Sequence, residues 1–179
     1  MTKSDPTQSA LVARWLCHDL ASPIATLLTA SELLGDQGDP EINSLITQAI
    51  RRLAARLKLV RLAMGSAAVM SAPPLEKLFA EALPDTSVTL DLPANAPSAN
   101  VIAASVLILA ELSRTTPISV TAKGAHWTDE TPAAKALAAA LSRVSDEPRG
   151  SMIALAAAQA KASGWTLAPH PAGLSFAQS

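Results

Sequence analysis

Gly35-Asp36-Gln37-Gly38-Asp39-Pro40 separates two long segments in which apolar residues recur every three or four positions. The glycines favour the end of one helix, and Asp-Pro is a frequent start of the next. Before this break, the segment from Asp5-Pro6 to about Leu34 has apolar residues at 12, 16, 20, 23, 27 and 34. After it, Glu41 to Met64 has them at 42, 46, 49, 53, 57, 60 and 64. The sequence therefore predicts an antiparallel helical hairpin.

A single hairpin cannot cover the apolar stripes of both its helices. We therefore expect a second copy to close a four-helix bundle in a homodimer. We assign residues 1–65 to this hairpin. Residues 66–74 are assigned to a linker, because Gly65-Ser66 to Pro73-Pro74 combines small residues with proline.

Residues 75–179 are expected to form a second domain, because the period of the apolar pattern changes there. The pattern predicts helices at 75–82, 99–113, 133–144 and 151–162, and strands at 86–92 and 118–122. A final hairpin is predicted from 165–167 and 174–176, turning near 171–173. Residues 123–132 receive no element. This order predicts a small α/β sandwich and makes the whole chain α+β.

Composition limits the possible partners. The chain has 179 residues, 49% of them apolar and 16% charged, with a net charge of −1. This balance gives no overall attraction to nucleic acid or to an anionic membrane, so neither is expected as a partner. Cys17 is the only cysteine, which excludes an internal disulfide and fits a reducing compartment. No apolar run reaches the roughly 18 residues of a membrane span, so we expect a cytoplasmic protein.

His18 is the residue with the clearest potential for chemistry. At about 100° per residue it lies roughly 200° from the apolar stripe of the first helix, so it should face solvent. Its neighbours on that face are small, namely Ala21, Ser22, Ala25 and Thr29, with Arg14 one turn before. Neutral imidazole is a nucleophile that can carry a phosphoryl group, and Asp19 could orient the ring or accept its proton. Taken alone, an exposed histidine is as often merely solvated.

The run His18-Asp19-Leu20-Ala21-Ser22-Pro23 resembles the H-box of sensor histidine kinases, in which an acidic residue follows the phosphoacceptor histidine and a proline lies five positions after it. The extended run from Arg14 to Pro23 more closely resembles the ChpT-type histidine phosphotransferases of alphaproteobacteria. Hairpin length, linker and element order match as well, so the resemblance covers nearly the whole chain.

The resemblance implies a fold like the dimerisation and ATPase domains of a histidine kinase, with the ATPase half degenerate. It also implies a phosphorelay protein in which His18 and Asp19 form the catalytic site. The phosphoryl group would come from the receiver domain of a hybrid histidine kinase and pass to response regulators of the CtrA type.

Three departures from the kinase pattern argue against ATP binding. Glu111 occupies the position of the asparagine that helps to hold magnesium in kinases. Trp127-Thr128-Asp129 lacks the glycines of the nucleotide box, and Pro148-Arg149-Gly150 has one glycine where kinases have a phosphate loop. We therefore expect no cofactor, with magnesium bound only by the partner receiver domain.

The second helix carries five basic residues and no acidic residue between 42 and 64: Arg51, Arg52, Arg56, Lys58 and Arg61. Antiparallel pairing places residues near 55 beside His18, where positive charge would attract the acidic phosphorylation pocket of a receiver. The expected partner-binding residues are Arg14, Ala21, Ser22, Ala25, Arg52 and Arg56. The alternative is a basic face that is simply solvated.

Two rival functions remain open. One is an authentic ATP-dependent kinase, and the other is a dimeric adaptor that binds receivers without transfer. Cys17 is expected in the core or a groove, because adjacent helical residues diverge too far for it to pair with His18. His126 and His170 fall in predicted loops without metal-ligand spacing. The tryptophans Trp15, Trp127 and Trp165 are expected to be packing anchors.

Overall fold

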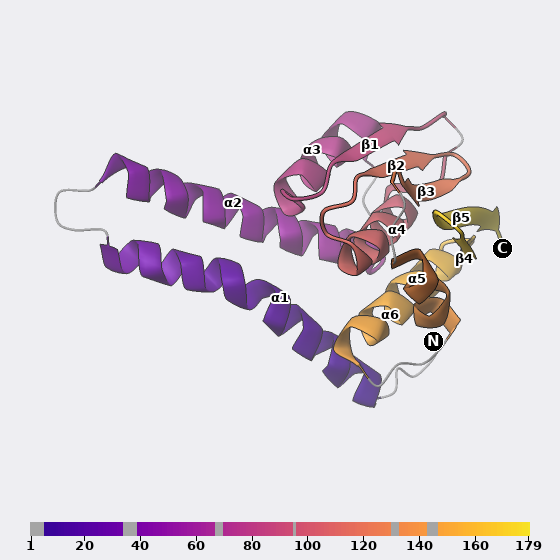
Figure 1. Cartoon of the computed structure of the whole chain (residues 1–179), viewed down its shortest axis with the longest axis horizontal. Coiled ribbons are helices and arrows are strands. Elements are labelled where there is room, and N and C mark those ends of the chain that lie inside the picture. Colours follow the sequence, from indigo (N-terminus) through magenta and orange to yellow (C-terminus); the bar gives the residue numbers. More distant parts are fainter. Residues whose placement is uncertain (1–5, 34–38, 67–69, 95, 130–132, 143–146) are drawn as a thin grey trace.

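A computed structural model describes residues 6–33, 39–66, 70–94, 96–129, 133–142 and 147–179. These residues form six helices and a five-stranded mixed sheet, which confirms the predicted α+β class. Figure 1 shows the two longest helices projecting together as a hairpin from a compact body that holds the sheet.

The hairpin consists of α1 (Pro6–Leu33) and α2 (Pro40–Ala63), close to the predicted bounds. Asp39 caps α2, because its side chain accepts a hydrogen bond of 2.8 Å from the backbone N–H of Glu41. Pro40 fills the first turn, where its missing N–H costs nothing. Gly35 to Gly38 and Leu34 lie outside the described residues. The expected pairing of a second hairpin into a four-helix bundle stays a prediction.

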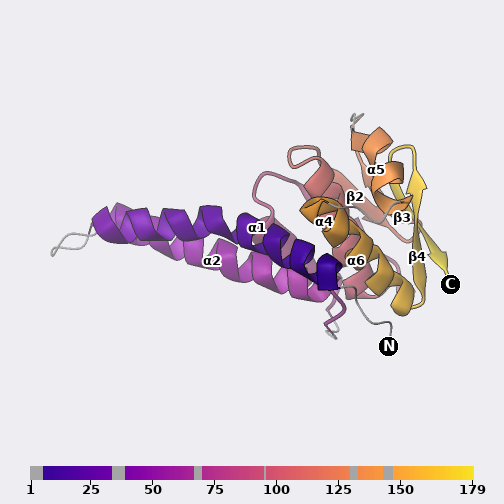
Figure 2. The ribbon, with the colours of Figure 1, turned by 90° about the horizontal axis from the view of Figure 1, so that it is seen from below.

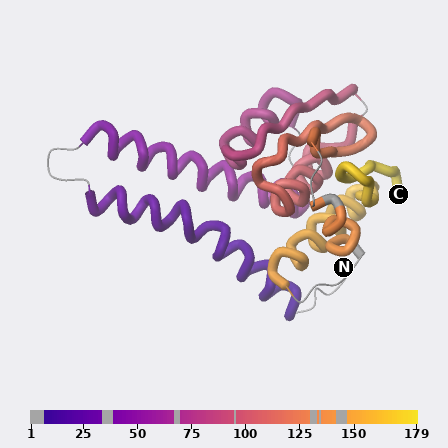
Figure 3. Tube along the Cα trace, viewed as in Figure 1, coloured from indigo at the N-terminus to yellow at the C-terminus, as the bar shows by residue number. Residues whose placement is uncertain are grey.

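Helix α1 changes direction in its middle part, as the tube in Figure 3 shows. Pro23 lies inside this helix. A proline within a helix removes one backbone hydrogen bond and clashes with the preceding turn, which is a sufficient cause for a bend. Figure 1 shows that the two helices lie close together near their loop and diverge toward the other end, where they meet the rest of the chain.

The second part of the chain alternates helices and short strands. In chain order these are α3 (Ala72–Ala82), β1 (Val88–Asp91), α4 (Ala99–Leu112), β2 (Ile118–Thr121), β3 (Gly124–Trp127), α5 (Ala133–Ser142), α6 (Pro148–Ala162), β4 (Trp165–His170) and β5 (Gly173–Gln178). The sheet order is β1-β2-β3-β5-β4, and only β1 and β2 run parallel. Helix α3 begins at Ala72, inside the segment predicted as linker.

Strand β3 lies within residues 123–132, for which the sequence pattern predicts no element. Its residues Gly124-Ala125-His126-Trp127 include glycine and alanine, which are depleted in strands, and no β-branched residue. Its pairing with β5 depends on glycine, because a Cβ added at Gly124 would lie 2.1 Å from the carbonyl oxygen of Leu174. On β5, Gly173 has a φ of +150°, a conformation that other residues rarely adopt.

One hydrophobic core joins the hairpin to the sheet. Helix α4 lies at its centre, with Val101, Val106 and Leu107 fully buried. The core extends from Leu59 of α2 to Leu174 of β5 without interruption. Figure 2 shows α4 and α6 between the hairpin and the strands. The core thus contains residues from both predicted domains, 1–65 and 75–179. The division of the chain into these two domains stays a prediction.

The described part of the chain contains no helix that is both long and apolar enough to cross a membrane.

Replacing Gly124 with alanine should lower the free energy of unfolding by about 1–3 kcal/mol, because the new methyl group would push β5 away from β3. Denaturant unfolding measures this loss. Ser119→Ala on the adjacent strand β2 is the matched control and should change stability by less than about 0.5 kcal/mol. Equal stability of the two variants would contradict the close approach.

Candidate functional site

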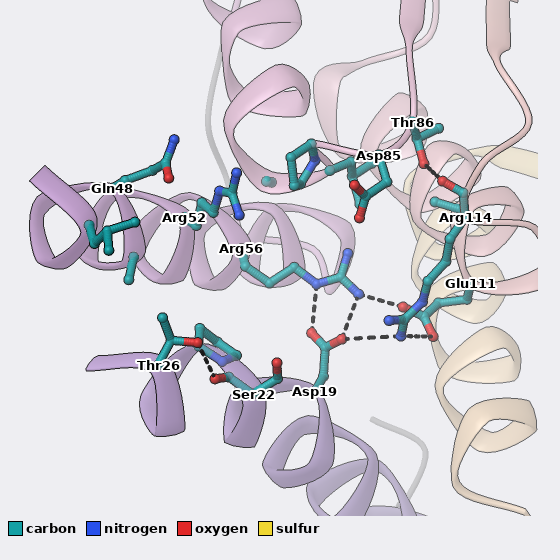
Figure 4. A pocket seen from close by; sticks show the side chains of 17 residues that line it. Asp19, Ser22, Thr26, Gln48, Arg52, Arg56, Asp85, Thr86, Glu111 and Arg114 are labelled. Carbon is teal, nitrogen blue, oxygen red and sulfur yellow. Dashed lines mark hydrogen bonds and ion pairs between the residues drawn. The ribbon is translucent and has the colours of Figure 1, made fainter. Parts of the chain in front are cut away.

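A buried ion-pair cluster joins α1, α2 and α4 at the point where the hairpin opens. The Nε atom of Arg56 donates to one carboxylate oxygen of Asp19 at 2.6 Å, and its NH2 group donates to the other at 3.1 Å. The same NH2 group donates to Glu111. Figure 4 shows the guanidinium of Arg56 between the two carboxylates. One arginine therefore holds acidic residues from two different helices.

The carboxylates of this cluster are buried, so each of them needs a positively charged or hydrogen-bonding partner. The side chain of Glu111 is 2% exposed and that of Asp19 is 9% exposed. Trp15 closes one side: its Nε1 donates to Glu111 at 3.2 Å, and its ring centre lies 5.9 Å from the guanidinium carbon of Arg56. Burial by itself lowers the pKa of Arg56, but the hydrogen bonds and charges of Asp19 and Glu111 outweigh it and raise that pKa above its ordinary value. Arg56 is therefore a permanent cation.

Two further arginines stand at the mouth of the cluster. The NH2 group of Arg114 lies 3.7 Å from Asp19 and 3.9 Å from Glu111, and the Nε of Arg149 lies 3.9 Å from Glu111. Their side chains are 61% and 57% exposed. These separations exceed hydrogen-bond length. The two arginines therefore add positive charge near the carboxylates of Asp19 and Glu111, but no hydrogen bond to these carboxylates fixes their side chains. Sequence reasoning missed both, because they are distant in sequence from His18.

His18 is exposed on α1, as predicted. It lines a cleft of about 370 Å³ between α1, the end of α4 and the start of α6. The cleft is lined by Arg14, Trp15, His18, Asp19, Glu111, Arg114, Glu147, Pro148 and Arg149. The basic residues that share this cleft with the histidine thus come from α1, from the segment after α4 and from α6, and none comes from α2.

The predicted docking residues divide between two places. Ser22, Arg52 and Arg56 line a second cavity of about 330 Å³ between α1 and α2, which Figure 4 shows. Asp19, Glu111 and Arg114 line both cavities. Ala21 and Ala25 are exposed on α1. The structure therefore brings Arg14 and Asp19 to the cleft of His18, and places Arg52 in the adjoining groove.

Two of these residues differ from expectation. Arg56 is 9% exposed and bound by two carboxylates, so it is part of the buried cluster and not of a solvent-facing basic surface. Asp19 was expected to orient the ring of His18 or accept its proton. Its carboxylate instead receives two hydrogen bonds from Arg56, because neighbouring residues on a helix point about 100° apart.

The remaining candidates are the cysteine, the two other histidines and the tryptophans. Cys17 is exposed, contrary to expectation, since it lies about 200° around α1 from buried Trp15. His126 and His170 lie in β3 and β4 and not in loops, with ring centres 4.7 Å apart. Burial and, secondly, the charge of His170 lower the pKa of His126. The tryptophans pack as expected: Trp127 is 3% exposed, and Trp165 contacts Phe176 edge to face.

Glu111 does not fit a magnesium site. Its carboxylate receives hydrogen bonds from Arg56 and Trp15, and two more arginines lie within 4.0 Å. Four cationic or donor groups around one carboxylate leave no position for a divalent cation, which would be repelled by the arginines. Within the described ranges, no group of three or more histidine, cysteine, aspartate or glutamate side chains is arranged to hold a metal ion.

Comparison with family models gives no match, and comparison with curated proteins gives none. Among solved structures, the chain is similar to a bacterial phosphotransferase determined at 1.7 Å, with a TM-score of 0.65. The two sequences are 18% identical, and the match covers 98% of this chain and 97% of that chain. The chain therefore shares the fold of that phosphotransferase along nearly its whole length.

Replacing Arg56 with leucine should lower the free energy of unfolding by about 3–5 kcal/mol, because Asp19 and Glu111 would lose their common buried partner. Arg52→Leu, one helical turn earlier on α2 and exposed, should change it by less than about 0.5 kcal/mol. Urea unfolding of both variants measures the difference. Similar small losses would mean that the cluster contributes little to stability.

Proposed function

We propose that this protein is a phosphorelay histidine phosphotransferase of the ChpT type, which carries a phosphoryl group on His18 and does not use ATP. It would accept the group from the receiver domain of a hybrid histidine kinase and pass it to a response regulator of the CtrA type. The observation that carries the proposal is the position of His18, exposed at a cleft lined by arginines. Fold similarity to a bacterial phosphotransferase supports a phosphotransfer role.

The chemistry requires a nucleophile that a large partner can reach. His18 is exposed, and so are the small residues Ala21, Ser22 and Ala25 that follow it on α1. An unprotonated ring nitrogen of His18 would attack the phosphorus of an aspartyl phosphate. A nitrogen–phosphorus bond forms, the bond between phosphorus and the aspartate oxygen breaks, and the aspartate leaves as a carboxylate with the electron pair. The second transfer is the reverse reaction with another receiver's aspartate.

The same site argues against an ATP-dependent kinase. In the kinase pattern the position of Glu111 carries an asparagine for magnesium, whereas here the carboxylate is bound by Arg56 and Trp15. A nucleotide's phosphates would also meet this buried carboxylate. The phosphoryl group would therefore have to come from a phosphoprotein, with magnesium supplied in the receiver's own acidic pocket.

A homodimer forms part of the proposal, and its support is the apolar surface of the hairpin. Six large aliphatic side chains are exposed there, between 37% and 64%: Ile24, Leu28, Leu33, Leu45, Ile50 and Leu57. On α2, Ile50, Leu53 and Leu57 continue the three- and four-residue spacing of a bundle seam. Burying such a surface against a second copy would stabilise the pair by about 25 cal/mol per Å².

Leu57→Glu should convert the dimer to a monomer that remains folded, because the new charge would enter the seam while the side chain is already 37% exposed within one chain. Sedimentation velocity at micromolar concentration measures the state. Lys58→Glu, the exposed neighbour, should remain dimeric. A wild-type protein that sediments as a monomer would overturn the dimer.

His18→Ala should retain its fold and lose all transfer, since an exposed histidine contributes little to stability. His18→Gln should lose transfer as well, because it keeps much of the bulk and polarity but has no nucleophilic ring nitrogen. Each variant is incubated with a phosphorylated receiver, and acid-labile, base-stable label is followed. Transfer that persists in either variant would contradict the role of His18. Binding of receivers without any transfer to wild type would favour the adaptor.

A further inference from the structure

Arg114 and Arg149 line the cleft of His18 although both belong to the second part of the chain. We propose that these two arginines bind the phosphoryl group while His18 carries it, so that the cleft is an oxyanion site built jointly by the hairpin and the body. The inference rests on the proposed function of His18. It concerns the carrier state of the protein, not its docking to a receiver.

Both arginines are held in place through their backbones. The hydroxyl of buried Thr86 donates to the backbone carbonyl of Arg114, just beyond α4, as Figure 4 shows. Arg149 lies in the first turn of α6, directly after Pro148. Because α1, α4 and α6 pack into one core, the two guanidinium groups reach the cleft from rigid supports on the side opposite α1.

Neither arginine forms a hydrogen bond with the buried carboxylates. Asp19 and Glu111 already receive hydrogen bonds from Arg56, and Glu111 receives one more from Trp15. Arg114 and Arg149 approach the same carboxylates only to 3.7–3.9 Å, with more than half of each side chain exposed. Both guanidinium groups can therefore turn toward a stronger anion without breaking a hydrogen bond of either carboxylate.

A phosphoryl group on His18 would be such an anion. A phosphorylated side chain carries a charge of about −1.5 to −2 and three acceptor oxygens, which match the planar donor fork of arginine. The charged residues that face this cleft are Arg14, Asp19, Glu111, Arg114, Glu147 and Arg149, with Arg56 behind them. In the unmodified protein the cations and anions lining the cleft are equal in number, so the added phosphoryl charge would have Arg114 and Arg149 as its mobile counterions.

The pKa of the phosphoryl group itself tests this inference. Phosphoramidate, a small phosphoryl donor, is used to phosphorylate the full-length protein, so that no receiver is required. The ³¹P chemical shift of phosphohistidine is then followed against pH in wild type, Arg114→Gln, Arg149→Gln and the double variant. Lys161→Gln is the control, because Lys161 is exposed in the last turn of the same α6, about 18 Å along the helix from Arg149.

Each glutamine variant should raise the pKa of the phosphoryl group by about 0.5–1 unit, and the double variant should raise it further. In Arg114→Lys and Arg149→Lys the pKa of the phosphoryl group should stay close to the wild-type value, because lysine keeps the positive charge. An unchanged pKa in the double variant, or an equal rise in Lys161→Gln, would overturn the inference. Failure of receivers to phosphorylate His18 would instead refute the proposed relay and leave this measurement intact.

Discussion

The guanidinium of Arg56, buried between Asp19 and Glu111, is the constraint on which the arrangement of the molecule depends. It is the one side chain in the described structure that hydrogen bonds to carboxylates of both α1 and α4. Buried charges are tolerated only when they are paired. Separating the hairpin from the body would take Arg56 away from Glu111 and expose the Arg56–Asp19 pair to water. The cluster therefore fixes the position of α1, and with it His18, relative to α4 and α6.

This constraint gives His18 a defined environment on a helix that would otherwise be a plain surface. Asp19, the next residue, is held by Arg56, so the helical turn that carries the histidine is anchored at its inner side. The ring itself remains exposed on the outer side. A nucleophile held on a rigid element but reachable by a macromolecule is what a carrier of phosphoryl groups between proteins requires.

Local sequence patterns were sufficient for the hairpin and for most of the second part. Asp39-Pro40 marked the start of α2, and the three- and four-residue spacing gave both long helices to within about one residue. Strand β3 was not predictable, because its glycine and alanine do not favour a strand and its close approach to β5 at Gly124 is a tertiary property. Helix α3 began early because prolines in a first turn are compatible with a helix.

The candidate site was predictable only where residues are close in sequence. Helical geometry gave the exposure of His18 and the small residues beside it. The same geometry could not show that Arg56 points inward to Glu111, which lies 55 residues away. Arg114 and Arg149 were not identifiable for the same reason. Glu111 was recognisable from the sequence as a departure from the kinase pattern, but its hydrogen bonds with Arg56 and Trp15 were not predictable.

Locating the phosphoryl group on the protein tests whether His18 carries it. Wild-type protein is phosphorylated by a cognate phosphorylated receiver, digested under alkaline conditions and mapped by mass spectrometry. The carrier role of His18 predicts a single phosphorylated residue, His18 itself, with a ³¹P signal typical of a nitrogen–phosphorus bond. Phosphate on any other residue, or a His18 that remains unmodified while phosphate reaches a response regulator, would contradict it.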